Sequence, residues 1–170
     1  EWLGGQDTVY TNPDGALSGT VLFPITPAQK NGLEDLSITP LTHDDGTKEF
    51  IGTYTAYSGR EIKSELLRTV DFRTIDLVPM RGAAARNKGM ALFPRRIDGR
   101  YVMIGRQDGK NLFLLRSDSL DTWDDEGVFL MGPKSPWEFI QIGNCCTPGR
   151  PGAGGCVLTP VGGRWPICSP

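Results

Sequence analysis

The chain has 170 residues, of which 38% are hydrophobic, and its 20 acidic and 18 basic side chains leave a formal net charge of −2. This length can bury a normal single core, and the near-neutral balance without a basic cluster excludes the electrostatic footprint of a nucleic-acid-binding protein. No apolar run approaches the length of a membrane span and no signal-peptide pattern opens the chain, so we expect a cytoplasmic protein without a nucleic-acid or membrane partner.

The first part of the chain is rich in turns and carries one short apolar run. Its clearest turn is Asn-Pro-Asp-Gly at residues 12–15. Residues 21–25, Val-Leu-Phe-Pro-Ile, predict a short strand that stops at Pro24 and Pro27, because proline cannot donate a hydrogen bond to a strand ladder. Two adjacent carboxylates, Glu34 and Asp35, follow before the stretch 37–39.

A strand–turn–strand–turn unit then occurs twice. Its successive parts are residues 50–57, 58–60, 64–69 and 71–75 in the first copy, and residues 101–106, 108–110, 111–117 and 119–123 in the second. Matching positions lie roughly 48 to 51 residues apart, which is typical of four-stranded propeller blades. The small-residue stretch 82–88 connects the copies, and residues 90–94 predict a further strand.

These features predict an all-β fold of the β-propeller type. Sustained helical periodicity is absent from the sequence. A closed propeller of four or more blades needs at least about 200 residues, so we expect this chain to be part of a larger protein. Propeller loops gather around one channel, so polar residues where blades begin are candidates for one shared site.

The composition changes abruptly near residue 145, and we expect two regions, a partial propeller domain at residues 1–145 and an aberrant tail at residues 146–170. The tail has no Asp or Glu and is dense in Gly, Pro, Arg and Cys. The next blade is due there by the repeat, but only residues 156–159 resemble a strand, which favours a frameshift or a truncation over a plain flexible tail.

The single His43 and the four cysteines lack zinc-site spacing, so we expect no metal. The cysteines are Cys145, Cys146, Cys156 and Cys168.

Three clusters could carry chemistry. Glu34 and Asp35 could supply the carboxylic acid that a glycoside-cleaving site holds near the leaving oxygen, although carboxylates before a strand are also common on surfaces. Residues 86–88, Arg-Asn-Lys, could face the channel and suit an anionic or polyhydroxyl ligand, or could form a solvated connection. Arg106 ends an apolar strand before an Asp-Gly turn, where it could grip a phosphate or serve as a hairpin-edge arginine.

Four segments, residues 31–35, 52–58, 87–101 and 137–145, together resemble glycoside hydrolase family 130 in order and spacing. That family contains β-mannoside phosphorylases and related β-mannosidases on a five-bladed β-propeller. The resemblance therefore implies an incomplete five-bladed propeller with about three blades present.

The resemblance also implies roles for individual residues. Asp35 matches the proton donor, which acts through a substrate hydroxyl while inorganic phosphate attacks the anomeric carbon with inversion. Lys88 and Arg106 match cationic contacts to phosphate or sugar. Glu34, Tyr57, Asn87 and Asp108 are assigned to substrate binding. Phosphate would be a co-substrate and an oligosaccharide the substrate, with no metal or organic cofactor, and the full-length parent could form a homo-oligomer.

The chain departs from the family pattern at three places. The common Glu-Asp-Pro-Arg reads Glu-Asp-Leu-Ser here, so Ser37 lacks a cation expected beside the acid. Gly89 stands where many members have Asp after Asn-Lys. The histidine of a later phosphate-contacting motif is missing, because residues 158–162 read Leu-Thr-Pro-Val-Gly.

We therefore expect a fragment of a carbohydrate-active enzyme that resembles β-mannoside phosphorylases and is inactive by itself, because an unclosed propeller lacks part of its site. Three alternatives stay open. They are a β-mannosidase of the same family, a furanosidase-type propeller hydrolase, which would need acidic residues on three blades, and a non-catalytic carbohydrate-binding propeller.

Overall fold

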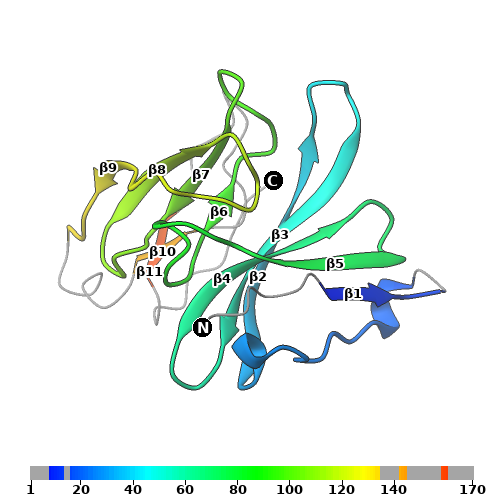
Figure 1. The fold of residues 1–170 in the computed structure, drawn as a ribbon. Helices are drawn as coiled ribbons and strands as arrows, with labels where there is room; N and C mark the ends of the chain where they lie inside the picture. The colour runs from blue at the N-terminus through cyan, green and yellow to red at the C-terminus, as the bar shows by residue number, and fades with distance from the viewer. Residues whose placement is uncertain (1–7, 14–15, 135–141, 145–157, 161–170) are drawn as a thin grey trace.

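The computed structural model describes residues 8–13, 16–134, 142–144 and 158–160, which form an all-β structure dominated by two antiparallel sheets (Figure 1). The larger sheet has the strand order β1-β5-β4-β3-β2, and the second has the order β6-β7-β8-β9. The strands of the larger sheet are β1 (Thr8–Thr11), β2 (Gly32–Thr42), β3 (Lys48–Tyr57), β4 (Ile62–Thr69) and β5 (Thr74–Pro79). Those of the second are β6 (Ala91–Leu92), β7 (Tyr101–Gly105), β8 (Leu112–Ser117) and β9 (Val128–Met131).

The predicted repeat is confirmed as two equivalent hairpins, β3–β4 and β7–β8. Phe50 pairs with Thr69 in the first hairpin, and Tyr101 pairs with Ser117 in the second. The turns beyond them are also equivalent, because the hydroxyl of Thr69 donates to the carbonyl of Thr74 and that of Ser117 donates to the carbonyl of Thr122. Each hairpin is preceded by a strand that pairs with its first member, β2 and β6 respectively, so the unit of repetition is a four-stranded antiparallel sheet.

The main hydrophobic core lies between the two sheets. Successive residues of a strand point to opposite faces, so β3 and β4 contribute Ile51 and Leu66 to this core and Tyr54 and Leu67 to a second cluster on the far face of the larger sheet. Trp123, which is fully buried, anchors the turn after β8 in the main core, as the apolar anchor of the second repeat predicts. The main core consists of Leu41, Ile51, Leu66, Met80, Ala84, Ala85, Met90, Leu92, Met103, Leu115, Leu120 and Trp123.

Backbone hydrogen bonds also join the two sheets at their connections. The N–H of Thr42, at the end of β2, donates to the carbonyl of Pro94 at 2.9 Å. Arg81, after β5, exchanges backbone hydrogen bonds with the turn after β8, since its N–H donates to the Asp121 carbonyl and its own carbonyl accepts from the N–H of Trp123. The sheets are therefore held by both apolar packing and main-chain pairing, which fixes the loops between them.

The segment before β2 departs from expectation. Residues 21–25 form no strand, so that prediction is wrong, and the chain instead passes through two short 3-10 helices, η1 (Leu17–Gly19) and η2 (Pro27–Gln29). Leu22 packs on the far-face cluster, whereas Val21, Phe23 and Ile25 are exposed. The run is apolar, but among the described residues no strand pairs with it to form a ladder.

Only two short pieces of the region after residue 134 are described. They are β10 (Ile142–Asn144) and β11 (Leu158–Pro160), which pair antiparallel with Asn144 opposite Leu158. This pair joins the two predicted regions, because β10 lies before residue 145 and β11 lies in the expected tail. The four cysteines lie outside the described residues, so the frameshift interpretation stays a prediction. Within the described part of the chain, no helix is long and apolar enough to cross a membrane.

Candidate functional site

The predicted acidic pair lies at an irregularity in β2. Glu34 pairs with Thr55 of β3, but the next regular pair is Ser37 with Thr53, so two residues of β2 bulge out of the ladder. Asp35 occupies the bulge with a left-handed backbone, φ 54°. A bulge re-aims side chains and is common beside active sites. Here it leaves both carboxylates accessible, with side-chain exposures of 48% for Glu34 and 59% for Asp35.

Lys88 reaches this acidic pair from the loop between β5 and β6. Its Nζ donates a hydrogen bond to Oδ2 of Asp35 at 2.9 Å and lies 3.6 Å from Oε2 of Glu34. The Lys88 side chain is 20% exposed, so most of its stem is covered while the ammonium meets the two carboxylates. Residues 53 positions apart in the sequence therefore form one charged cluster, as the candidate site requires.

Arg106 lies directly behind Lys88. It follows the last residue of β7, is only 3% exposed, and its Nε donates to the backbone carbonyl of Lys88 at 2.8 Å. Burial lowers the pKa of the Arg106 guanidinium, and the nearby charge of Asp35 acts in the opposite direction. An arginine remains charged at neutral pH under such shifts, so a fixed positive charge lies beneath the site.

Asn87 connects the loop to both sheets. Its backbone is left-handed, φ 65°, and its side-chain Oδ1 accepts from the N–H of Lys88 at 3.0 Å. Its carbonyl accepts from the hydroxyl of Ser64 in β4 at 3.0 Å. Its Nδ2 packs against Gly109 in the β7–β8 turn, where an added Cβ would lie 2.7 Å away. Non-glycine residues in this conformation cluster at functional sites, which is consistent with a role for Asn87 there.

Asp108 is engaged by its own turn. Its Oδ1 accepts from the backbone N–H groups of Lys110 and Asn111 at 2.8 and 2.7 Å, and its Oδ2 accepts from the Asn111 amide at 2.6 Å. Partial burial opposes ionisation, but these hydrogen bonds outweigh it and lower the pKa of Asp108. Its carboxylate therefore stabilises the hairpin turn, and its assignment to substrate binding stays a prediction.

Tyr57 ends β3 at the same end of the sheet as the acidic pair. It lies opposite Gly32 of β2, two positions beyond Thr55, so its side chain is on the face of the sheet that Thr55 shares. It is partly buried, and its hydroxyl makes only a long contact of 3.5 Å to the Gly59 carbonyl. The structure thus places Tyr57 beside the cluster without joining it to a charged group.

Ser64 and Gly89 support the site, and neither was selected as a site residue from the sequence. Ser64 holds the Asn87 carbonyl, and Gly89, with φ +82°, leaves the space that the Arg106 guanidinium fills. Gly89 appeared in the sequence only as a departure from a family pattern. Ser64 gave no signal in the sequence, because its partner is 23 residues away.

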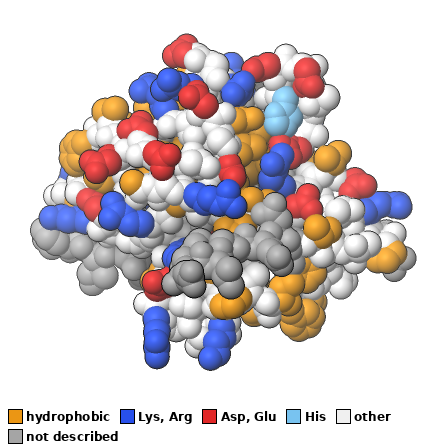
Figure 2. Space-filling model, in the orientation of Figure 1, with side chains coloured by type: hydrophobic (Ala, Val, Ile, Leu, Met, Phe, Trp, Pro, Cys, Tyr) orange, Lys and Arg blue, Asp and Glu red, His pale blue; other side chains and the backbone are white. Residues whose placement is uncertain are grey.

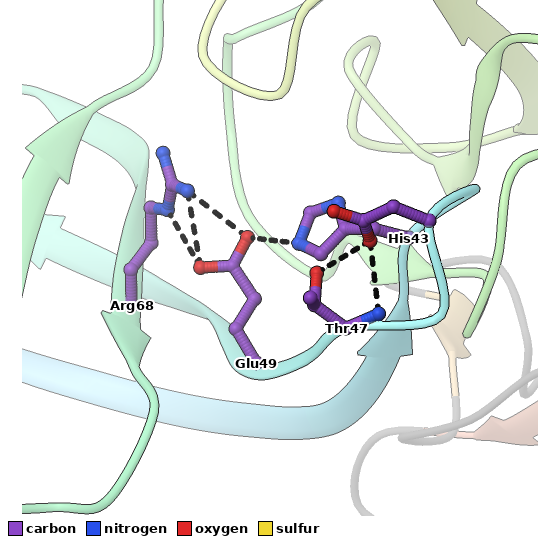
Figure 3. A network of polar contacts seen from close by, with 5 residues as sticks. His43, Thr47, Glu49 and Arg68 are labelled. Atoms are coloured by element: carbon purple, nitrogen blue, oxygen red, sulfur yellow. Dashed lines mark hydrogen bonds and ion pairs between the residues drawn. The ribbon is translucent and has the colours of Figure 1, made fainter.

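A second polar cluster lies at the other end of β3 (Figure 3). Glu49, with a side chain only 10% exposed, accepts hydrogen bonds from Nη2 and Nε of Arg68, and its Oε1 lies 2.9 Å from Nε2 of His43. Figure 2 shows acidic and basic side chains interspersed around this histidine, so that face of the molecule presents no large patch of one sign. Glu49 is nearly buried, whereas the Arg68 side chain is 39% exposed, so the two form a half-buried ion pair that holds β3 to β4.

The arrangement at Asp35 can support acid chemistry on an anionic or polyhydroxyl ligand. An accessible carboxyl group can exchange a proton, an ammonium can bind an oxyanion, and a buried guanidinium adds positive potential. Among the described residues, no group of three or more His, Cys, Asp or Glu side chains is placed to hold a metal ion.

Comparisons with known proteins give matches to mannoside-active enzymes. No family model matches the chain. A 1,2-β-oligomannan phosphorylase from Thermoanaerobacter is 35% identical over 57 residues, which make up 34% of this chain and 19% of that protein. The structure of a β-1,2-mannobiose phosphorylase from Listeria innocua aligns with a TM-score of 0.64 and 21% identity, covering 81% of this chain and 39% of that one.

A third match concerns a family with two activities. It is a structure reported with the finding that the GH130 family of mannoside phosphorylases contains glycoside hydrolases that target β-1,2 mannosidic linkages in Candida mannan. It aligns with a TM-score of 0.54 and 15% identity, over 69% of this chain and 38% of that one. These matches confirm the resemblance found in the sequence, and the structural alignments show a shared fold. The chain spans about a fifth of the curated relative and less than half of each matched structure.

Proposed function

We propose that this chain is part of a glycoside hydrolase family 130 enzyme, a β-mannoside phosphorylase built on a five-bladed β-propeller of which about three blades are present. The observation that carries the proposal is the convergence of Asp35, Lys88 and Arg106, three residues selected from sequence, within one cluster. Lys88 meets the acidic pair directly and Arg106 bonds to the Lys88 carbonyl from behind, so two positive charges lie near one acidic pair. Such an arrangement suits a phosphate-dependent site.

In the proposed reaction Asp35 is the proton donor. Its proton passes through a substrate hydroxyl to the glycosidic oxygen as the bond from that oxygen to the anomeric carbon breaks. An oxygen of inorganic phosphate forms the new bond to the same carbon from the opposite face, so the products are mannose 1-phosphate and the shortened saccharide. Because phosphate is the nucleophile, no protein nucleophile is needed, and no metal or organic cofactor enters the proposal.

The cationic side of the site would consist of Lys88 and Arg106. The ammonium of Lys88 lies against the exposed carboxylate of Asp35 and would contact phosphate directly, in place of the cation that is missing at Ser37. Glu34, Asn87 and Tyr57 would line the sugar site, because all three lie at this end of the larger sheet. Asp108 would act beside them only if substrate binding released it from its turn.

The isolated chain would be inactive under this proposal, since it supplies less than half of the matched structures. The full-length parent would act on a β-linked manno-oligosaccharide and could assemble as a homo-oligomer. Its charged product does not leak through a membrane, which favours a cytoplasmic enzyme.

The test is an assay of the full-length parent with a β-1,2-linked mannobiose in the presence and absence of inorganic phosphate. The phosphorylase proposal predicts mannose 1-phosphate, formed only when phosphate is present. Release of free mannose at the same rate in both conditions would contradict it. That outcome would favour the alternative, a β-mannosidase, which the matched structure reported with glycoside hydrolases makes a specific second candidate. Sugar binding without turnover in either condition would indicate a non-catalytic carbohydrate-binding propeller.

A further inference from the structure

The loop that carries Lys88 is pinned by three buried side chains from three different strands or strand ends. Ser64 of β4 donates to the Asn87 carbonyl at 3.0 Å, Arg106 donates to the Lys88 carbonyl at 2.8 Å, and Thr53 of β3 donates to the Met90 carbonyl at 2.8 Å. All three are nearly inaccessible, with exposures of 2%, 3% and 4%. Such a set of contacts holds the loop backbone in one position.

From this geometry we infer that Arg106 is a positioning residue, which fixes the backbone of Lys88 so that its ammonium meets Asp35, and that Gly89 is the residue that admits Arg106. The functional consequence rests on the proposed function, in which Lys88 contacts phosphate. Of the two cations of the site, Lys88 touches the ligand, and Arg106 acts through Lys88.

Exposure separates the two roles. Lys88 and the two carboxylates have side-chain exposures of 20%, 48% and 59%, whereas Arg106 is 3% exposed. A ligand that enters from the side of Asp35 meets the Lys88 ammonium before it could reach the guanidinium. Arg106 therefore contributes positive potential and a hydrogen bond to the loop, and Lys88 makes the direct contact.

Gly89 is required for this packing by both space and backbone conformation. A Cβ at residue 89 would lie 2.3 Å from Nε of Arg106 and 3.0 Å from its Cζ, which is closer than non-bonded atoms approach. Its φ of +82° is also a conformation that L-amino acids with a side chain rarely adopt. An alanine here must displace either the guanidinium or the loop, and both changes release the Lys88 carbonyl.

Precise placement matters because a displacement of about 1 Å in a positioning group can cost roughly a hundredfold in rate. With the loop fixed, Lys88 is held at hydrogen-bonding distance from Asp35 before any ligand arrives. These three hydrogen bonds to the loop backbone explain how the long side chain of Lys88 can serve as a defined phosphate contact.

The test measures how fast an amine-reactive reagent modifies each lysine of the intact chain, peptide by peptide, by mass spectrometry. In the unmodified sequence, we expect Lys88 to react several-fold more slowly than the exposed Lys110. Gly89→Ala and Arg106→Gln should each raise the Lys88 rate several-fold while Lys48 and Lys110 are unchanged. Arg106→Lys should give an intermediate rate. Asp35→Asn is the positive control, since it removes the closer of the two ion pairs that Lys88 makes with Glu34 and Asp35.

Two results would overturn the inference. One is an unchanged Lys88 rate in both Gly89→Ala and Arg106→Gln when Asp35→Asn raises it. The other is a wild-type Lys88 that already reacts as fast as Lys110. If Arg106→Gln unfolds the chain, every lysine will react faster, and the decision then rests on Gly89→Ala and on Thr53→Val, which removes one pinning hydroxyl at nearly constant volume. These rates do not depend on turnover, so failure of the phosphorylase assay leaves this test intact.

Discussion

The ammonium of Lys88 lies 2.9 Å from the carboxylate of Asp35, although the two residues are 53 positions apart in the sequence. Asp35 projects from a bulge in β2, and Lys88 projects from the loop that leads into the second sheet. The contact exists only because the two sheets pack face to face around one core. The stability of that packing and the chemistry of the site are therefore linked, and each can be tested separately.

The core between the sheets should be sensitive to truncation. Leu115 of β8 is fully buried in it, so Leu115→Ala should lower the free energy of unfolding by about 2–5 kcal/mol through lost burial and the cavity left behind. Val128→Ala is the matched control, because Val128 is 56% exposed and its truncation should cost less than about 0.5 kcal/mol. Urea denaturation of both variants measures the difference. Equal losses would mean that the sheets do not share this core.

The Glu49 cluster should behave as a structural ion pair. Glu49→Ala leaves Arg68 without its carboxylate partner and should cost about 1–3 kcal/mol of unfolding free energy. Glu61→Ala removes an exposed carboxylate that lies 3.0 Å from Lys63 and should cost less than about 1 kcal/mol. A chemical denaturation series on the two variants gives the comparison. A Glu49→Ala variant as stable as the Glu61→Ala control would show that the half-buried Glu49–Arg68 pair adds nothing.

Tyr54 should resist ionisation in alkali. Burial raises the pKa of its hydroxyl strongly, and the nearby charge of Glu65 raises it further, because a phenolate would lie beside a carboxylate. Ultraviolet titration of phenolate absorbance up to about pH 11 should therefore give the same amplitude for the parent chain and for Tyr54→Phe. A smaller amplitude in Tyr54→Phe would show that Tyr54 titrates with the exposed tyrosines and is not enclosed as described.

Asp108 should make the fold sensitive to acid. Folding lowers the pKa of Asp108 below the ordinary value for an aspartate, so its contribution to stability is present above that ordinary value and is lost as the pH falls through the lowered pKa. Asp108→Asn keeps an acceptor oxygen but not the charge. The difference in unfolding free energy between wild type and Asp108→Asn should thus be largest near neutrality and should shrink below about pH 4. A difference that is constant with pH would mean that the charge of Asp108 plays no part in the turn.

The parts of the fold that follow from local sequence were predicted well. Glycine turns at residues 58–60 and 108–110, between runs of strand-forming residues, specify hairpins by themselves, and both hairpins are present. The strand expected at residues 21–25 is absent, because an apolar run becomes a strand only when another strand lies beside it. Strand pairing is a long-range property that this stretch of sequence does not encode.

The candidate site could likewise be predicted only in part from the sequence. Asp35, Lys88 and Arg106 could be selected from residue type and family pattern, and they do converge. What holds them could not be predicted, because the contacts of Ser64 and Thr53 with the loop depend on how β3 and β4 lie under it. The assignment of Asp108 to substrate binding stays a prediction, and the hydrogen bonds that its carboxylate accepts from its own turn became visible only in the structure.

The proposed function depends above all on Asp35 being the acid of a site that it shares with Lys88. The most direct measurement is the rate of phosphate-dependent cleavage of a β-1,2-linked mannobiose by the full-length parent carrying Asp35→Asn. We predict that turnover falls by about 10²–10⁴-fold, as expected for loss of a general acid, while binding of the sugar persists. Turnover within a few-fold of the unmodified parent would contradict the assignment.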